Sequence, residues 1–361
     1  MIKKDLVSVN ILTYNGQDLI GPCLDSVLKQ SYLNIEILVI DNASEDETLK
    51  QATRYKIQDT KFPISIIKNK ENLGFSAGHN IGIRECKGEY VLCLNQDVVL
   101  DKDFVKNAVE AMKVDDKIAA VQGRLLRIAN LNELRMDTID TTGLVIFKNR
   151  RIIGRGQGGK DEGQYKRGEI FGVDGAAPLY RCSALEDVKL PIFEGPVPQN
   201  IRVNPRLDPR KSAPYEYFDE DFFMYKEDVD LAWRMRLYGW RAVYEPEAIG
   251  YHMRGAGEKA VKTPIAIVKG RRKISKFAKF YSFKNKRLMQ IKNELSSLFF
   301  RHFCSIIINE MAAWGYVLFF ETYTLKAIKS LIKEIPIARR KRKIIMARKK
   351  VGTREMKKWF I

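Results

Sequence analysis

Short apolar runs alternate with segments of helical periodicity along the first 125 residues. Between Leu19 and Leu28, for example, the apolar residues fall on one helical face. The runs themselves are almost continuously apolar, which is typical of strands that are covered on both faces. This alternation predicts an α/β fold in which helices flank a mostly parallel sheet. The runs lie at residues 7–12, 37–40, 64–67, 90–94 and 118–121.

Polar residues follow four of these runs at the point where each run ends. In an open α/β sheet, ligands bind outside the carboxyl ends of the strands, so four polar ends predict one shared crevice. Asp97 is the most informative of these residues, because a buried carboxylate is costly unless it is paired or bound to a metal. The four polar ends are Thr13–Asn15, Asp41–Asn42, Asn69–Asn72 and Asn95–Asp97.

The second half of the chain has a different pattern. Small residues at 175–177 precede a short helical segment, and residues 191–217 are rich in proline and lack periodicity, which predicts a long loop. Dense apolar patterning resumes at 222–240, and an extended segment then ends near His252. A GxGxxG spacing at 154–159 is not followed by a helical pattern, so we interpret it as a loop and not as a dinucleotide site.

The basic residues are concentrated near the C-terminus. From Val261 to Ile361 the chain holds 26 Lys and Arg but 5 Asp and Glu, whereas the preceding residues hold 37 and 39. Apolar residues at helical spacing, with lysines and arginines between them, predict a basic amphipathic helical region at 258–361 that binds an anionic membrane surface. The alternative is a pair of core helices with a solvated basic end.

The cysteines and the N-terminus bear on the cellular compartment. Five scattered cysteines without a CxxC pair indicate free thiols in a reducing cytosol. The first residues enter a strand pattern at once, so we expect no signal peptide. Together with the basic region, these features predict a cytoplasmic protein that is peripheral on the inner face of the cell membrane.

Seven stretches carry a resemblance to a known family through their order and spacing. Together they resemble the inverting glycosyltransferases of family 2, which have the Rossmann-like GT-A fold, and in particular bacterial rhamnosyltransferase-like members. The resemblance implies a catalytic domain at 1–257, with a nucleotide-binding half at 1–125 and an acceptor half at 126–257. The stretches are TYNG (13–16), VIDNASEDET (39–48), NLGFSAGHNIGI (72–83), LNQDV (94–98), GAAPLYR (175–181), FFMYKEDVDLAWRMRLYGW (222–240) and YHMRG (251–255).

The resemblance also implies an activity. Members transfer a sugar from a nucleotide-sugar donor by direct displacement, and the expected donor here is dTDP-L-rhamnose. The expected acceptor is a growing glycan, which is either linked to a lipid such as a polyisoprenoid or attached to the cell surface. No nucleic-acid partner is expected. The alternatives are a sugar-phosphate nucleotidyltransferase, although a glycine-rich loop is missing after the first strand, and a non-enzymatic nucleic-acid binder that uses the basic region.

Roles for individual residues follow from the same resemblance. Asp97 and His252 are expected to bind a divalent metal, Mg²⁺ or Mn²⁺, although Asn95-Gln96-Asp97 holds one carboxylate where many relatives have two. Asp228 is the expected general base, kept ionised by a helix N-terminus, with Glu227 beside it. The expected nucleotide-sugar contacts are Thr13, Tyr14, Asn15, Asp41, Asn42, Asn72, Gly74, Phe75, Asn95, Gly175 and Ala176.

Five of these residues also have a structural interpretation. Asp97 could cap the region after Leu100, and His252 could be a packed histidine. Phe75 could belong to the core. Glu227 and Asp228 could be acids that simply favour a helix start.

Overall fold

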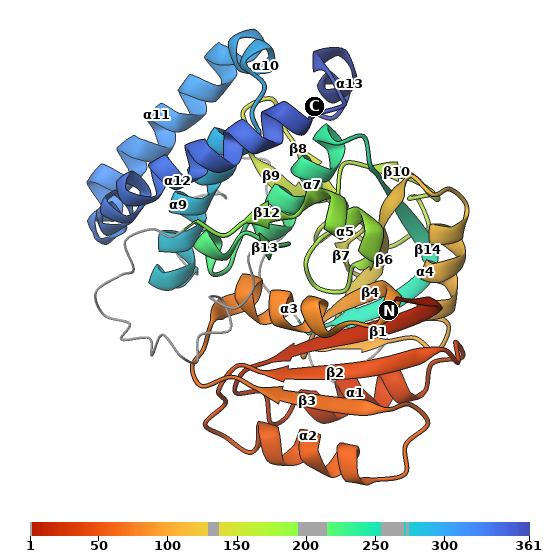
Figure 1. The fold of residues 1–361 in the computed structure, drawn as a ribbon. Coiled ribbons are helices and arrows are strands. Elements are labelled where there is room, and N and C mark those ends of the chain that lie inside the picture. The colour runs from red at the N-terminus through yellow and green to blue at the C-terminus, as the bar shows by residue number, and fades with distance from the viewer. Residues whose placement is uncertain (1, 129–136, 194–214, 254–270, 272–273) are drawn as a thin grey trace.

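The computed structural model describes residues 2–128, 137–193, 215–253, 271 and 274–361 (Figure 1). A ten-stranded mixed sheet forms its centre, in the order β10-β14-β6-β11-β4-β1-β2-β3, with β5 paired to β14 and β7 paired to β6. The predicted boundary at 257 and most of the predicted loop at 191–217 lie outside the described residues. The sheet strands are β1 (Lys3–Thr13), β2 (Ile35–Asp41), β3 (Ile64–Lys68), β4 (Gly88–Asn95), β5 (Val98–Leu100), β6 (Ile118–Arg127), β7 (Ile139–Thr141), β10 (Gly168–Ile170), β11 (Leu179–Arg181) and β14 (Arg241–His252).

The N-terminal half of the sheet is parallel, as predicted. β1 pairs in parallel with both β2 and β4, and β2 pairs in parallel with β3. Val7 and Val9 point into the core on one face of β1, whereas the Asn10 amide on the other face donates to the His79 carbonyl at 3.0 Å. Both faces of the strand are therefore covered, which explains its nearly continuous burial.

The other half of the sheet is mixed. β6 and β14 are parallel to each other, but β11 is inserted antiparallel between β4 and β6. The 154–159 stretch forms turns after a short strand and is not followed by a helix, as predicted. Two small sheets lie outside the main one, and their strands are β8 (Leu144–Ile146), β9 (Ile152–Gly154), β12 (Leu190–Pro191) and β13 (Tyr215–Glu216).

Helices cover both faces of the sheet. One apolar cluster joins α1, α2 and α4 to the strands, and a second joins α5 and α7 to the opposite face. α3 also lies on that opposite face, because its Gly78 packs against Leu12 of β1. The bounds are α1 (Ile20–Leu28), α2 (Thr48–Ile57), α3 (Gly74–Glu85), α4 (Phe104–Lys113), α5 (Cys182–Val188), η1 (Glu220–Phe222) and α7 (Glu227–Leu237).

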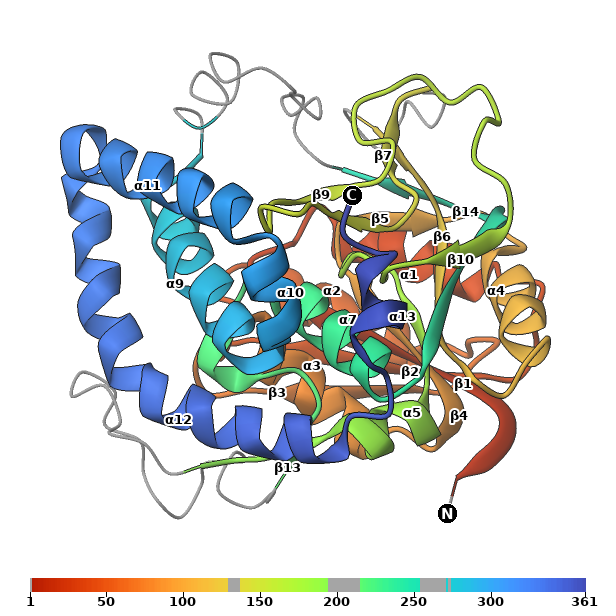
Figure 2. The same cartoon turned by 90° about the horizontal axis from the view of Figure 1, so that it is seen from above.

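The basic C-terminal region is helical, as predicted, and it packs against the α7 side of the sheet (Figure 2). α9 lies against both α7 and α12. The last residues pack against α7 and β8. The Phe360 ring meets Trp233 of α7 at 5.4 Å, and Ile361 exchanges backbone hydrogen bonds with Ile146 of β8 and with Lys148. The elements are α9 (Lys276–Asn293), α10 (Ser296–Arg301), α11 (Phe303–Phe320), η2 (Thr322–Leu325), α12 (Lys326–Arg348) and α13 (Thr353–Lys357).

α11 presents an apolar face to solvent. It is the one helix among the described residues that is long and apolar enough to cross a membrane, and 11% of that 18-residue window is buried. Phe319 is 81% exposed, and Ile308 and Met311 are each 68% exposed. The opposite side of the helix packs on the protein through buried Ile306 and Val317.

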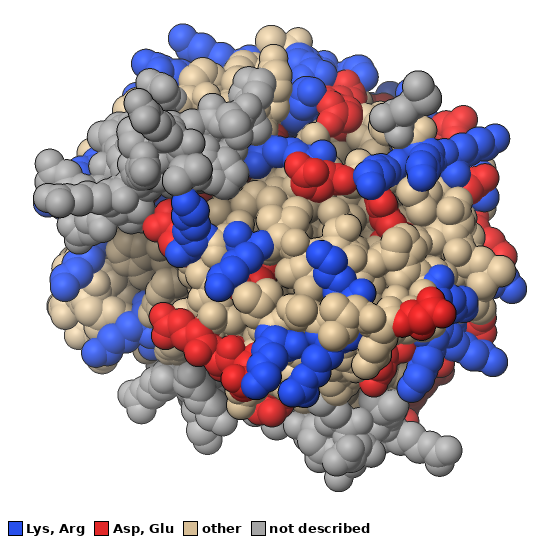
Figure 3. All heavy atoms as spheres, turned by 60° about the horizontal axis from the view of Figure 1, so that its bottom comes forward, with Lys and Arg blue, Asp and Glu red and all other residues tan. Residues whose placement is uncertain are grey.

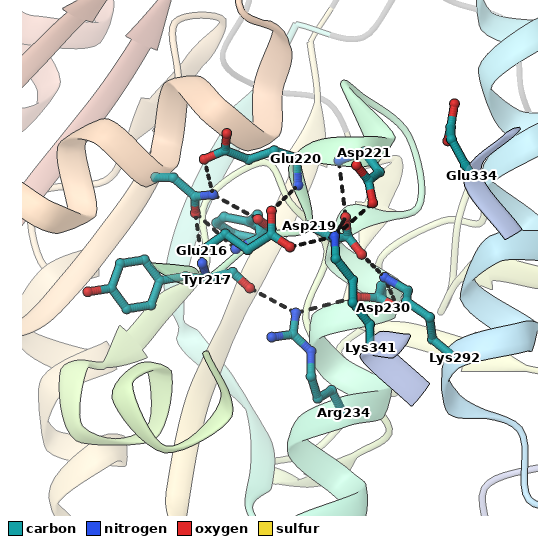
Figure 4. A network of polar contacts seen from close by, with 12 residues as sticks. Glu216, Tyr217, Asp219, Glu220, Asp221, Asp230, Arg234, Lys292, Glu334 and Lys341 are labelled. Atoms are coloured by element: carbon teal, nitrogen blue, oxygen red, sulfur yellow. Dashed lines mark hydrogen bonds and ion pairs between the residues drawn. The ribbon is translucent and has the colours of Figure 1, made fainter. Parts of the chain in front are cut away.

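A buried network of charges joins the C-terminal helices to the segment before α7 (Figure 4). The Lys341 ammonium of α12 lies 2.6 Å from Glu216, 2.7 Å from Asp219 and 2.8 Å from Asp221. Lys292 of α9 pairs with the same Asp219, and it also pairs with Asp230 of α7 at 2.9 Å. Both lysines are buried, so each charge depends on its partners for solvation.

The charges in this network balance. Burial raises the pKa of Glu216 to about 8, so this carboxyl is mostly protonated at neutral pH. Four carboxylates then remain, and they meet four cations, since Arg234 pairs with Asp230 and Lys284 pairs with Glu334. The cations are Lys284, Lys292, Lys341 and Arg234, and the carboxylates are Asp219, Asp221, Asp230 and Glu334.

We expect Lys341→Met to destabilise the whole protein. The substitution leaves buried Asp219 with one cation fewer, and breaking a buried pair in this way costs about 3–5 kcal/mol. Urea unfolding followed by circular dichroism measures the loss. The matched control is Lys343→Met, at an exposed position of the same helix, which should change the stability by less than about 0.5 kcal/mol. Equal effects of the two variants would contradict the role of the network.

Candidate active site

The carboxyl ends of β1, β2 and β4 meet at one edge of the sheet. The strand registers place Thr13 opposite Asp41, and Leu12 opposite Asn95, so these polar residues lie at one level. Tyr14 follows Thr13 and is 41% exposed. The crevice that the sequence predicts therefore begins with residues that the sheet itself aligns.

Gln96 fixes the first of these strand ends. Its Oε1 accepts hydrogen bonds from the Thr13 hydroxyl and, at 3.0 Å, from the Tyr14 amide. Its Nε2 donates to the Tyr14 carbonyl at 3.0 Å. These hydrogen bonds hold the Tyr14 backbone on both sides. They therefore limit the positions that the exposed Tyr14 ring can take beside the strand ends.

Asn42 joins the second strand end to the loop that precedes α3. Its Oδ1 accepts from the Asn69 side chain at 2.9 Å and from the Leu73 amide at 3.2 Å. Its Nδ2 donates to the Asn72 side chain at 3.0 Å and to the Gly74 carbonyl at 3.1 Å. All four interactions are internal, so Asn42 and Asn72 shape the loop that faces the crevice.

The neighbouring residues are similarly engaged. The buried Asp41 carboxylate accepts from the Ser44 amide at 3.3 Å, and the Asn15 side chain accepts from the Glu45 amide at 2.9 Å. Together they hold the 44–46 turn against the end of β1. Both residues lie at the predicted strand ends.

Gly74 and Phe75 form the start of α3. Gly74 has φ of +78°, and a Cβ atom there would lie 2.5 Å from the Phe223 carbonyl, so the position requires glycine. The Phe75 ring packs edge-on against His79 at 4.4 Å and also contacts Phe218. It lies next to Gly175, where an added Cβ would be 3.2 Å from the ring. Phe75 is therefore a packing residue at the rim of the site.

Asp97 and His252 are brought together by strand pairing. β5 runs antiparallel to β14 with Val98 opposite His252, and the Met253 amide donates to the Asp97 carbonyl at 2.9 Å. The Asp97 carboxylate lies 3.4 Å from His252 Nε2. On the other side of the ring, His252 Nδ1 lies 2.8 Å from the Asp140 carboxylate.

The two carboxylates control the charge of this histidine. Burial alone would lower the pKa of His252, but hydrogen bonds with Asp140 and Asp97 outweigh burial and raise that pKa to about 9. Asp140 itself is buried and is paired with Arg127 at 3.2 Å. A carboxylate on Nδ1 is the arrangement that orients metal-binding histidines, because it leaves Nε2 to face the ligand site.

This pair fits a divalent cation that takes its other ligands from a substrate. Among the residues that the structure describes, no group of three or more Asp, Glu, His and Cys side chains is arranged so that it could hold a metal ion by itself. Mg²⁺ is commonly held by one or two carboxylates together with substrate phosphates. Asp97, and His252 once its Nε2 has lost its proton, are the residues that could supply the protein's share of such a site, with Asp140 behind the histidine.

Asp228 lies on the other side of the same strand ends. The Asn95 amide donates to the Ala176 carbonyl at 2.9 Å, and the Gly175 amide donates to the Asp228 carboxylate at 3.3 Å. These two contacts connect the end of β4 with the start of α7. The Ala176 methyl is buried in the core beneath the sheet, so its backbone alone takes part.

The two acids at the start of α7 differ in charge state. Burial first, and then the neighbouring Asp174 carboxylate, raise the pKa of Asp228 to about 6. Hydrogen bonds from the Val229 and Gly175 amides act in the opposite direction, as expected for a helix N-terminus, but burial outweighs them. Burial and the Asp228 charge raise the pKa of Glu227 well above its usual range. At neutral pH, Asp228 is thus mostly the carboxylate, and Glu227 is the harder of the two acids to ionise.

The segment before these acids has an unusual backbone. Phe223, Tyr225 and Lys226 have φ values of 59°, 70° and 77°. Left-handed conformations cost side-chain-bearing residues about 1–2 kcal/mol each. Surrounding contacts must therefore hold this segment in place.

The comparisons with known proteins agree with this geometry. Residues 8–189, about half of the chain, match the family described as Glycosyl transferase family 2. The chain belongs to glycosyl transferase family 2. A poly-beta-1,6-N-acetyl-D-glucosamine synthase of Staphylococcus aureus (strain MSSA476) is 28% identical over 238 residues, which are 65% of this chain and 47% of that protein. The chain thus spans about half the length of the curated relatives it matches.

Solved structures show the same fold. S. aureus TarS 1-349 in complex with UDP-GlcNAc aligns with a TM-score of 0.53 at 15% identity, covering 95% of this chain and 89% of that chain. GalNAc-T7 with UDP, GalNAc and Mn²⁺ aligns with a TM-score of 0.52, covering 87% and 57%. The expected GT-A fold is confirmed, and the family assignment supports the expected glycosyltransferase.

Three polar residues of this family 2 glycosyltransferase site escaped the sequence reasoning. Gln96 stands inside the motif that drew attention to Asp97, but its hydrogen bonds to the first strand end depend on tertiary structure. Asp140 lies in the short strand Ile139–Thr141, where the neighbouring polar residues give no sign in the sequence that the acid is buried and paired. Asp174 directly precedes Gly175 and acts by raising the pKa of Asp228.

The raised pKa of Asp228 predicts the pH dependence of this transferase. A base must be deprotonated to accept a proton, so we expect kcat/KM to fall below pH of about 6. Asp174→Asn removes a negative neighbour, so it should move this acidic limb to lower pH. Initial rates of nucleotide release from pH 4.5 to 8, with circular dichroism as the control for folding, measure both effects. An acidic limb that does not move in Asp174→Asn would contradict the assignment.

Proposed function

We propose that this glycosyltransferase moves a sugar from a nucleoside diphosphate donor to a growing cell-surface glycan, with inversion at the anomeric carbon. The observation that carries the proposal is the placement of two functional groups around one set of strand ends. The Asp97–His252 pair lies at the start of β5 and the end of β14, and Asp228 joins the end of β4 through Gly175 and Ala176.

The chain's own groups fit a direct displacement. Asp228 accepts the proton of the acceptor hydroxyl while that oxygen forms a bond to the anomeric carbon. The bond from the anomeric carbon to the phosphate oxygen breaks, and its electron pair leaves with the nucleoside diphosphate. Asp97 and His252 would hold a Mg²⁺ or Mn²⁺ ion, which neutralises charge on the departing diphosphate when bound.

The donor half of the crevice is formed by the residues fixed around β1 and β2. Tyr14, which is exposed and held by Gln96, offers a ring to the base. The donor loop is held in place at Gly74, which packs against the Phe223 carbonyl. We place the nucleotide between these two, with its diphosphate toward Asp97.

Two donors are the candidates. The resemblance of the sequence motifs to rhamnosyltransferases favours dTDP-L-rhamnose. The named activity of the staphylococcal relatives, which make poly-β-1,6-N-acetyl-D-glucosamine, favours an N-acetylglucosamine donor. Both share a nucleoside diphosphate that the Asp97–His252 pair suits, so the sugar and base contacts decide between them.

The deciding experiment is nucleotide release from a panel of donors. We expect release from one donor, dTDP-L-rhamnose or UDP-GlcNAc, in the presence of Mg²⁺ or Mn²⁺, and none with a chelator. Asp228→Asn should retain nucleotide binding by calorimetry but lose about 10²–10⁴-fold in transfer rate. Asp97→Ala should instead lose the metal dependence of nucleotide binding.

The matched control is Asp103→Asn, which changes an acid at the start of α4 that binds Ser31. It should leave the transfer rate and the metal dependence of nucleotide binding unchanged. Normal turnover in Asp228→Asn would refute the assignment of the base. A chain that binds no nucleotide with any metal would refute the proposed function as a whole.

We further propose that α11 lies flat on an anionic membrane at the cytoplasmic face, where a lipid-linked acceptor would be found. Its inner side is fixed to α9, because Glu310 pairs with Lys286 at 2.8 Å and Arg287 at 2.6 Å. A helix held along one side in this way can enter the interface but cannot cross the bilayer while it stays docked. α12, which follows α11 after η2, carries exposed basic residues near its start, including Lys329 and Lys333, and these would attract anionic lipid.

Other parts of the surface have a different charge pattern. Figure 3 shows the face at the bottom of Figure 1, where basic and acidic side chains lie interspersed. A uniform polyanion would find no continuous basic surface there. This face therefore does not favour the binding of a nucleic acid.

The double variant Ile308→Ser with Phe319→Ser should weaken binding to anionic vesicles by at least about tenfold, since burying each side chain is worth about 1.5–3 kcal/mol. Flotation with phosphatidylglycerol vesicles, and with neutral vesicles for comparison, measures this. The matched control is Ile57→Ser, which removes an isoleucine that is 78% exposed at the end of α2, at the opposite end of the molecule (Figure 1). Vesicle binding that survives the double substitution would contradict the proposal.

A further inference from the structure

The strained segment that leads into the catalytic acids is held by one side chain of a C-terminal helix. The Asn285 amide of α9 donates to the carbonyls of Phe222 at 2.8 Å, Met224 at 2.9 Å and Tyr225 at 2.8 Å. Asn285 is fully buried. These carbonyls span the residues whose backbone turns into the left-handed region, and α7 begins two residues later.

Aromatic packing from the same helix reinforces this contact. The Phe223 ring stacks on Tyr281 with centroids 5.2 Å apart, and it meets the edge of Phe277 at 5.9 Å. Phe277, Tyr281 and Asn285 are spaced four residues apart, so one face of α9 carries all three. That face is directed at the 222–226 segment.

The other side of the segment borders the donor half of the site. The Ser76 amide at the start of α3 donates to the Phe223 carbonyl at 3.1 Å. Gly74 lies against that same carbonyl. The segment is thus held between the glycine turn of the donor loop and α9, and it continues into Glu227 and Asp228.

We propose that Asn285 is a positioning residue for the transfer reaction. By donating to three carbonyls of the strained backbone, it sets where α7 begins. It therefore also sets where the Asp228 carboxylate lies relative to the acceptor hydroxyl. This inference rests on the proposed role of Asp228. α9 lies outside residues 8–189, which match the family, and the proposal gives this helix a direct part in positioning the base.

The contact also has a consistent physical logic. An isolated left-handed residue costs free energy, and three within four positions persist only where neighbouring groups over-determine the backbone. A side-chain amide that satisfies carbonyls turned away from regular structure is such a group. Removal of the amide leaves buried carbonyls without a donor, which favours relaxation of the segment.

The test compares two asparagines of the same helix. Asn285→Leu removes the donors to the segment but keeps a similar volume. Asn293→Leu is the matched control, because Asn293 is also fully buried on α9 but donates to Asp230 and Met289. The full-length proteins are used, and each rate is normalised to the nucleotide-binding fraction measured by calorimetry.

For Asn285→Leu we expect a fall in kcat of about 10- to 100-fold, as for a misplaced catalytic group. KM for the donor should stay within about threefold, because the donor contacts are intact. Asn293→Leu should lose thermal stability but keep kcat per competent molecule. Equal losses of kcat in both variants, or full kcat in Asn285→Leu, would overturn the proposal.

Amide hydrogen exchange gives a readout that does not depend on activity. Exchange across 222–228 should accelerate in Asn285→Leu and stay as in the parent in Asn293→Leu. If Asn285→Leu does not fold, Asn285→Ser, which keeps one donor, carries the same comparison with a smaller effect. If the parent protein turns over no donor, the proposed function fails, whereas unchanged exchange at 222–228 defeats the positioning role alone.

Discussion

Two buried ammonium groups, on Lys292 and Lys341, hold the C-terminal helices to the segment that leads to Asp228, the proposed base. A buried charge is tolerated only where opposite charges replace its hydration. The carboxylates of Asp219 and Asp230 do so, and they flank the strained residues and the start of α7 on either side. Neither half of this pairing can keep its charges buried without the other, so the helices belong to the same stable unit as the crevice.

The sequence predicted the sheet and the alignment of its polar strand ends because both follow from local patterns. Continuous apolar runs specify covered parallel strands, and the polar residues that end them must meet at one edge. Strand pairing then brings Asp97 beside His252, which the resemblance anticipated. The antiparallel insertion of β11 could not be foreseen, because a strand of three residues has too little pattern to show its direction.

The parts that escaped prediction depend on contacts between distant residues. Gln96 and Asp140 act through partners that are remote in sequence, and no periodicity reports such pairs. The charge count of the C-terminal region had the same weakness, since it treats a paired, buried lysine and an exposed one alike. Lys292 and Lys341 are buried and structural, so the excess of charge overstates how much basic surface is free to meet a membrane.

α9 contacts both the strained segment beside Asp228 and α11, the proposed membrane helix. Asn285 faces the strained segment beside Asp228, while the next two residues, Lys286 and Arg287, pair with Glu310 of α11. A helix is stiff over this distance, so docking of α11 on a membrane would fix the height of the base above the lipid surface. An acceptor hydroxyl on a lipid-linked glycan must reach that height to be deprotonated. The same helix would thereby match the reach of the acceptor to the position of the base, without any contact between the membrane and the crevice.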